Sequence, residues 1–99
     1  MQTPFTKLQD SKATVTTAGQ RVQLNPVSTP CGKLTVTALE GNAGEIVYGG
    51  ATVVAALGAT RSGTPLVQGQ SVDIPIDDLS KVWLDAVNSG DGVSYTWLS

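Results

Sequence analysis

Residues 81–98 read KVWLDAVNSGDGVSYTWL, and this stretch decides the fold class. Apolar side chains occupy every second position on both sides of a turn-forming segment, as expected of two strands that each bury one face. The alternating positions are Val82, Leu84 and Ala86 before the turn, and Val93, Tyr95 and Trp97 after it. The segment NSGDG at 88–92 is rich in residues that tolerate hairpin-turn geometry, so the sequence predicts a β-hairpin here.

The two-residue period continues upstream through most of the chain. The expected strands are 14–17, 20–24, 33–39, 45–48, 51–57, 66–67, 71–76, 81–87 and 93–98. The segment GNAG at 41–44 predicts a second hairpin, which joins the strands on either side of it. The run at 51–57 is apolar enough to be a strand covered on both faces. Pro75 has no N–H to donate to a ladder, which places its strand at a sheet edge.

These segments predict an all-β, single-domain β-sandwich of about eight or nine short antiparallel strands, with a jelly-roll-like or barrel-like arrangement as the alternative. The chain has 99 residues, which is enough for one hydrophobic core. Residues 1–12 show neither strand alternation nor a helical stripe, so we expect a flexible N-terminal arm at 1–12 and the sandwich domain at 13–99. Phe5 and Leu8 would bury nothing on such an arm and are candidates for docking onto another subunit or protein.

Two parts of the chain resemble each other. GQRVQLNP at 19–26 resembles GQSVDIP at 69–75, and KLTVTALEGNAGEIVY at 33–48 parallels KVWLDAVNSGDGVSYT at 81–96. Tyr48 matches Tyr95 if the intervening loops differ by one residue. Either the match arises by chance in a β-rich chain, or two related β-halves pack face to face in a sandwich built by duplication.

Composition argues against two classes of partner. Only 14% of the residues are charged, the formal net charge is −2, and the six Lys and Arg residues are scattered, so no nucleic-acid-binding surface is expected. The N-terminal stretch is polar, and no later run approaches the roughly 18 apolar residues of a membrane span. The sequence therefore predicts a soluble protein without a membrane partner or a visible export signal.

Catalytic and metal sites lack the side chains that they need. The chain has no His, so neither Cys31 nor a serine has the usual base that activates a nucleophile. Cys31 stands alone and is expected to be a small buried hydrophobe. Asp85, Asp91 and the other aspartates are expected on wet strand faces or in turns, and their spacing matches no calcium loop. We therefore expect no enzymatic activity, no cofactor and no metal.

Trp83 lies opposite the inward row of its strand and is expected on the outer face of a sheet. It could anchor an interface, form a sugar-stacking platform with Asp85 and Asn88, or simply cover a sheet edge or pack under the N-terminal arm. The candidate partner-binding residues are Phe5, Leu8, Pro75, Trp83 and Asp85.

The succession GGATVVA, SGTPLVQGQSVDIPIDDLSKVWLDA and SGDGVSYTWL resembles small virion structural proteins of tailed bacteriophages. The resemblance covers roughly residues 41–98 and is weaker over 13–40. It implies a β-sandwich without catalytic residues that joins the phage particle, foremost as a head decoration (cement) protein that binds the major capsid protein and stabilises the shell. Such a protein is made in the host bacterial cytoplasm, resides in the virion and forms homo-oligomers on the particle.

Two other functions are compatible with the same residues. One is a small tail or fibre component, which would bind another virion protein. The other is a carbohydrate-binding β-sandwich module, which would need exposed aromatic residues grouped near carboxylates or amides. The sequence leaves open the virion protein bound, the location in head or tail, the oligomeric state, the strand order and the host.

Overall fold

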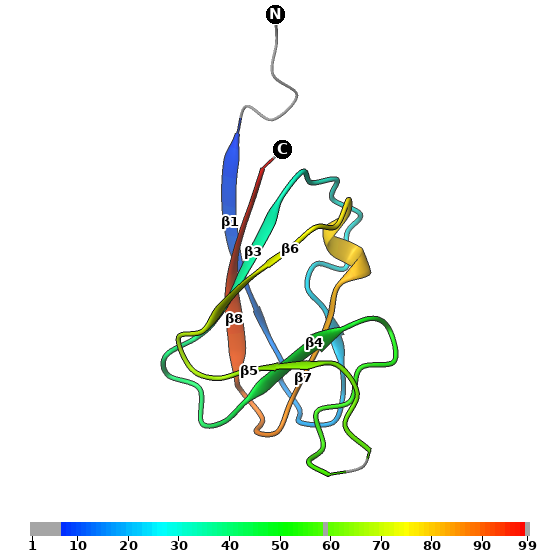
Figure 1. Ribbon diagram of the computed structural model, residues 1–99, viewed down its shortest axis with the longest axis vertical. Coiled ribbons are helices and arrows are strands. Elements are labelled where there is room, and N and C mark those ends of the chain that lie inside the picture. The colour runs from blue at the N-terminus through cyan, green and yellow to red at the C-terminus, as the bar shows by residue number, and fades with distance from the viewer. Residues whose placement is uncertain (1–6, 59, 99) are drawn as a thin grey trace, which may run out of the picture.

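The chain forms eight β-strands and one short 3₁₀ helix within residues 7–58 and 60–98, which the computed structural model describes (Figure 1). The strands are β1 (Leu8–Thr14), β2 (Val22–Gln23), β3 (Leu34–Ala38), β4 (Ile46–Gly49), β5 (Thr64–Leu66), β6 (Ser71–Ile74), β7 (Trp83–Ala86) and β8 (Gly92–Leu98). The 3₁₀ helix η1 (Leu79–Lys81) follows Asp78, whose carboxylate caps it by accepting a hydrogen bond from the Ser80 N–H.

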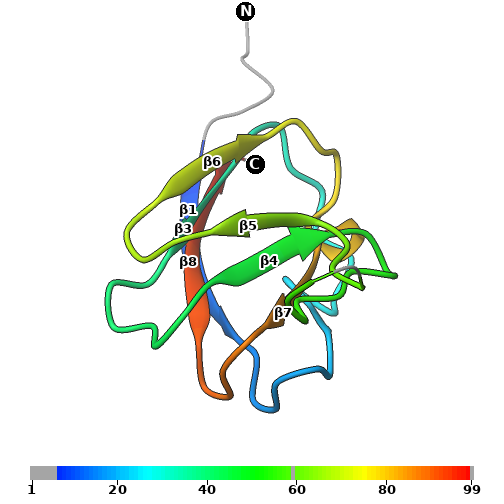
Figure 2. The ribbon, with the colours of Figure 1, turned by 60° about the horizontal axis from the view of Figure 1, so that its bottom comes forward.

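Within the described residues, the strands form two four-stranded antiparallel sheets that face each other (Figure 2). Sheet A has the order β1-β8-β3-β6 and sheet B the order β2-β7-β4-β5. Every connection except β4–β5 crosses from one sheet to the other, which is the winding of a jelly roll. This arrangement confirms the predicted all-β sandwich and selects its jelly-roll alternative.

Neither predicted hairpin forms, because each turn carries the chain from one sheet to the other: β3 and β8 lie in sheet A, and β4 and β7 in sheet B. Buried polar side chains join the two turns. The Asn42 side chain donates to the Gly92 carbonyl and accepts from the Gly92 N–H, both at 2.9 Å. The Asp91 carboxylate accepts from the N–H groups of Ala43 and Gly44, at 2.8 and 3.0 Å. Residues that favour tight turns thus build a corner of the sandwich. There the side chains of Asn42 and Asp91 provide hydrogen-bond partners for backbone N–H and C=O groups.

The predicted arm at 1–12 is wrong for residues 8–12. These residues belong to β1, which pairs with β8 from Leu8 opposite Leu98 to Thr14 opposite Gly92. The expected strand at 14–17 is accordingly reduced to Thr14, the last residue of β1. Phe5 and the rest of residues 1–6 lie outside the described residues.

The expected strand at 51–57 is also wrong. The described part of this segment has one isolated bridge, between Val54 and Ser62, and otherwise irregular backbone. Its apolar residues are buried for another reason, since Val53 and Ala55 pack with Val47 of β4 in a small second cluster. The apolar run at 51–57 is therefore explained by a loop that folds back onto sheet B, and not by a strand buried on both faces.

One hydrophobic core fills the space between the two sheets. The inward rows predicted for the last two strands lie in it: Val82, Leu84, Ala86, Val93, Tyr95 and Trp97. The rings of Tyr95 and Trp97 stack with their centroids 5.3 Å apart. Full burial of each large apolar side chain contributes about 1.5–3 kcal/mol, so this core dominates the stability of the fold.

Strand β6 lies at an edge of sheet A, as predicted from Pro75, which follows its last residue. Its partner is β3, which pairs Leu34 with Ile74 and Val36 with Val72. The opposite edge of the same sheet is β1.

The two stretches that resemble each other in sequence form topologically equivalent strands of the two sheets. Strands β1–β4 match β5–β8 in order, and reading sheet B as β5-β4-β7-β2 reproduces the order β1-β8-β3-β6 of sheet A. The registers agree as well, since Val36 faces Tyr95 in sheet A and the matching Leu84 faces Tyr48 in sheet B. The strand order is symmetric in this way in any jelly roll of the same winding, so it agrees both with duplication and with a chance match. Each half contributes strands to both sheets, however, so the expectation of one half per packing face is wrong.

Candidate interaction surface

The five predicted partner-binding residues do not form one site. Leu8 begins the edge strand β1 of sheet A, and Pro75 follows β6 at the opposite edge. Trp83 and Asp85 lie in β7 of sheet B. Phe5 lies outside the described residues. Alternation in the sequence predicted which side chains point away from the main core, but it could not show which of them lie on the same surface.

Asp85 is a structural residue, contrary to the expectation of a wet strand face. Its side chain is only 2% exposed and accepts three backbone hydrogen bonds. One oxygen accepts from Gly19 at 3.0 Å and from Ala86 at 2.9 Å, and the other accepts from Ala55 at 2.9 Å. Because both oxygens are engaged, Asp85 ties two loops to β7 and is not presented to a partner.

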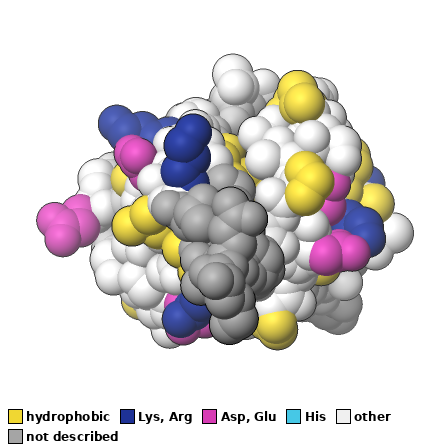
Figure 3. Space-filling model, turned by 90° about the horizontal axis from the view of Figure 1, so that it is seen from above, with side chains coloured by type: hydrophobic (Ala, Val, Ile, Leu, Met, Phe, Trp, Pro, Cys, Tyr) yellow, Lys and Arg dark blue, Asp and Glu magenta, His cyan; other side chains and the backbone are white. Residues whose placement is uncertain are grey.

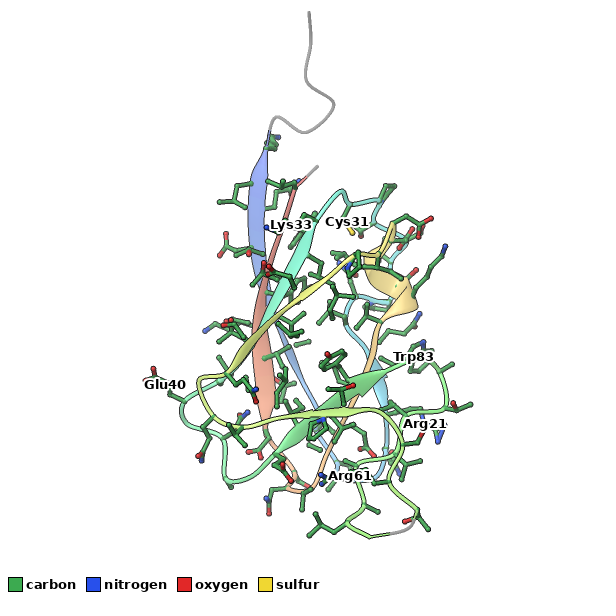
Figure 4. The ribbon with its side chains drawn as sticks, in the orientation of Figure 1. Arg21, Cys31, Lys33, Glu40, Arg61 and Trp83 are labelled. Carbon is green, nitrogen blue, oxygen red and sulfur yellow. The ribbon has the colours of Figure 1, made fainter. Side chains whose placement is uncertain are left out.

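Trp83 is half-buried on the outer face of sheet B, where it packs against the small cluster of Val47, Val53 and Ala55. Figure 4 draws it on the same side of the molecule as Arg21, whose Nε donates to the Val53 carbonyl at 3.0 Å. The ring thus covers a sheet surface and the loop folded over it. With Asp85 buried, the sugar-stacking arrangement that the sequence suggested is not assembled.

The outer face of sheet A is a continuous polar surface. Directly paired residues point to the same face, so the registers place small hydroxyl side chains in adjacent rows. These residues are Thr35, Thr37, Ser71, Ser94 and Thr96. Several of them bond across the strands, with Thr35 donating to Asp73 at 2.7 Å and the hydroxyls of Thr37 and Ser71 2.7 Å apart.

Apolar side chains mark one end of this face. Leu8 is 71% exposed and pairs with Leu98, the last residue of β8. A shallow depression of 220 Å³ lies between them and β3. Figure 3 looks down on this end of the molecule and shows separate hydrophobic side chains among charged groups and a larger area that is neither hydrophobic nor charged.

Within residues 7–58 and 60–98, no strand pairs with the second edge of β1, and the hydrogen bonds of β8 show which residues of β1 face that edge. The Leu98 N–H donates to the Lys33 carbonyl at 3.1 Å, so even-numbered residues of β8 bond to β3 and its odd-numbered residues bond to β1. The Val15 N–H donates to the Asp91 carbonyl at 2.9 Å, which agrees with this alternation. The residues of β1 that direct their N–H and C=O groups away from β8 are therefore Leu8, Asp10, Lys12 and Thr14.

The other edges of the described sheets are poorer templates for another strand. In sheet B, β2 has 2 residues, and β5 has 3 residues of which one is Pro65. In sheet A, β6 has 4 residues and is followed by Pro75. Strand β1 has 7 residues without Pro or Gly, so it presents the longest regular edge in the described structure.

The segments around η1 carry groups with shifted pKa values. The Ser28 hydroxyl, followed by the N–H groups of Ser80 and Thr29, donates to Asp78 and holds the pKa of its carboxyl far below the ordinary value. Desolvation, with Asp78 and Asp77 adding repulsion, raises the pKa of the Cys31 thiol. Cys31 is half-buried against the main core and donates to the Ile76 carbonyl, so it behaves as a small packing residue.

Two further observations concern sites of other kinds. Among the described residues, no three His, Cys, Asp or Glu side chains lie close enough together to hold a metal ion. The described residues also contain no helix with the length and apolar character of a membrane span.

Comparison of the chain with protein-family models, curated proteins and solved structures found no match.

Sequence reasoning missed β1 as a candidate surface. Its inward positions are Gln9, Ser11 and Ala13, which are polar or small and therefore give no two-residue hydrophobic period. The available signal was weaker: Asp10 and Lys12 are charges of opposite sign placed two residues apart, on one face of any strand that contains them.

Proposed function

We propose that the protein is a non-enzymatic virion structural protein that decorates the head of a tailed bacteriophage and binds it through the outer face of sheet A. The observation that carries the proposal is the polar, hydroxyl-rich face that ends in the exposed Leu8 and the neighbouring Leu98. The phage context comes from the resemblance of residues 41–98 to small virion structural proteins.

The composition of this face suits attachment to another protein. Ser and Thr side chains have few rotatable bonds, so ordering them at an interface costs little conformational entropy. Each hydroxyl both donates and accepts a hydrogen bond, which lets it match either kind of group on a partner. Leu8 adds apolar area at the end of the face, where a hydrophobic contact excludes water from the polar bonds around it.

Attachment of this kind stabilises a shell by mass action. A protein that binds the assembled capsid and not its separated subunits shifts the equilibrium toward the assembled state. Copies that bridge neighbouring subunits contribute modest contacts that add through multivalency. The fold is compatible with this role, since jelly rolls occur in viral capsid proteins, but they also occur in lectins. The outer face of sheet A and the sequence resemblance therefore support this role more than the fold does.

Co-sedimentation tests the proposal. Purified full-length protein is mixed with phage heads assembled without it, and the bound fraction is measured as a function of concentration. Leu8→Lys is expected to weaken binding by about tenfold or more, because it removes an apolar contact and introduces an unpaired charge. Leu57→Lys is the matched control, since Leu57 is 68% exposed in the loop between β4 and β5, and binding should be unchanged.

The outcomes separate the alternatives. Saturable binding that Leu8→Lys weakens and Leu57→Lys leaves intact supports the head-decoration role and the assigned face. Failure of the wild-type protein to sediment with heads overturns that role, and the same assay with isolated tails then tests a tail or fibre function. Tryptophan fluorescence during glycan titration tests the carbohydrate-binding alternative, for which a saturable change would be required.

A further inference from the structure

We propose that two copies of this chain pair through their β1 edges, antiparallel, about a two-fold axis at Ser11. The proposal follows from the exposed edge of β1 and from the order of its charges, and it does not depend on the proposed function. Figure 1 shows the first half of β1 at the margin of the molecule. Its outward residues Leu8, Asp10, Lys12 and Thr14 are all exposed, so the edge is accessible to a second copy.

The backbone groups of the two edges match in this pairing. A two-fold axis at Ser11 sets Asp10 of one copy opposite Lys12 of the other, and Leu8 opposite Thr14. These four residues are the ones whose N–H and C=O groups point away from β8, so each facing pair can exchange two hydrogen bonds. Ser11 meets its own symmetry mate as a non-hydrogen-bonded pair. The edge is thus self-complementary, as a two-fold interface requires.

The charges select this register over its neighbours. With the axis at Ser11, each Asp10 carboxylate faces a Lys12 ammonium, and the symmetry repeats the contact. Moving the axis by one residue, which keeps the free backbone groups facing each other, sets Asp10 opposite Asp10 or Lys12 opposite Lys12. Opposite charges directly across an antiparallel pair stabilise it and like charges destabilise it. Both flanking registers are therefore disfavoured.

The pairing would extend sheet A into one continuous sheet with β1 strands at its centre. The two-fold axis is perpendicular to the sheet, so the outer faces of both copies lie on the same side. Hydroxyl side chains such as Thr96 would then line a surface of twice the width. A partner that binds one outer face would meet two, and the second contact would form at high effective concentration.

Charge reversal tests the proposal on the full-length protein, by sedimentation velocity over a wide concentration range. The wild type is expected to be dimeric. Asp10→Lys and Lys12→Asp each place like charges opposite each other twice and should weaken dimerisation by about tenfold or more. The double variant restores opposite charges and should dimerise like the wild type. An equimolar mixture of the two single variants should form a heterodimer more strongly than either forms a homodimer.

Two further variants separate this interface from general effects. Glu40→Lys changes the net charge as Asp10→Lys does, on an exposed turn away from β1 (Figure 4), and should leave dimerisation unchanged. Lys12→Pro removes one outward N–H and leaves the ladder with β8 intact, so it should weaken dimerisation while the circular dichroism spectrum stays native. A wild type that is monomeric at every concentration, or a double variant as weak as the single variants, overturns the proposal. Head binding of the unchanged protein keeps the two proposals distinct: a dimer that does not sediment with heads overturns only the decoration role, and a monomer that does sediment with heads overturns only this pairing.

Discussion

Replacing Asp85 with Asn is expected to lower the free energy of unfolding by about 2–4 kcal/mol. The side chain is 2% exposed, and its two oxygens together accept hydrogen bonds from Gly19, Ala55 and Ala86 at 2.9–3.0 Å. An amide retains one acceptor oxygen and replaces the other by an NH₂ group. In either orientation, that NH₂ group faces at least one buried backbone N–H.

The magnitude follows from the bonds that change. A hydrogen bond to a charged acceptor contributes about 1.5–3 kcal/mol, and a buried donor left without a partner costs about 1–3 kcal/mol. The variant loses at least one bond outright, and the remaining bonds become neutral and therefore weaker. The expected loss is a large share of the about 5–15 kcal/mol that stabilises a typical domain.

Urea unfolding followed by tryptophan fluorescence measures this loss, because Trp97 is buried in the core and stacked on Tyr95. The midpoint should fall and the slope should stay unchanged. Asp73→Asn is the matched control, since Asp73 is exposed on the outer face of sheet A and should change stability by less than about 0.5 kcal/mol. If the free energy of unfolding of Asp85→Asn changes as little as that of Asp73→Asn, the anchoring role assigned to Asp85 is refuted.

The remaining predictions concern pH, packing and backbone conformation. Because the folded pKa of Asp78 lies below its ordinary value of 3.8, its stabilising contribution is complete above that pH and is lost as the pH falls toward the folded pKa. As the pH falls from about 5 to about 2, the urea midpoint of the wild type should therefore approach that of Asp78→Asn. A constant difference between the two midpoints over this range would contradict the prediction. Leu34→Ala removes a fully buried side chain and should cost about 2–5 kcal/mol in urea unfolding, whereas Leu57→Ala, at 68% exposure, should cost almost nothing. Gly63 has φ 119° and leaves 2.7 Å between an added Cβ and a β4 carbonyl oxygen, so Gly63→Ala should lower the melting temperature more than Gly58→Ala, where φ is 92° in open space.

The candidate surface was only partly predictable. Leu8 was predicted on a flexible arm as a partner-binding residue; it is 71% exposed, but it belongs to β1 and lies on the outer face of sheet A. Asp85 was not predictable as a buried residue, because its burial depends on two loops that approach β7 from distant parts of the chain. The side chain of Trp83 points away from the main core, as the alternation in its strand predicted, but the loop that contains Val53 packs against its ring.

The sequence alone determined the strand faces, because side-chain direction alternates locally and water selects the apolar face. Val82 and Leu84 are inward, as are Val93 and Tyr95, wherever their strands lie. Which strands share a sheet was decided by the tertiary structure. Turn-forming residues permit a chain reversal without specifying its partner, so NSGDG serves a corner between sheets as well as a hairpin. The accessible edge of β1 is likewise defined only in the tertiary structure, because pairing with β8 engages the backbone groups on one edge of the strand and decides which residues face the other edge.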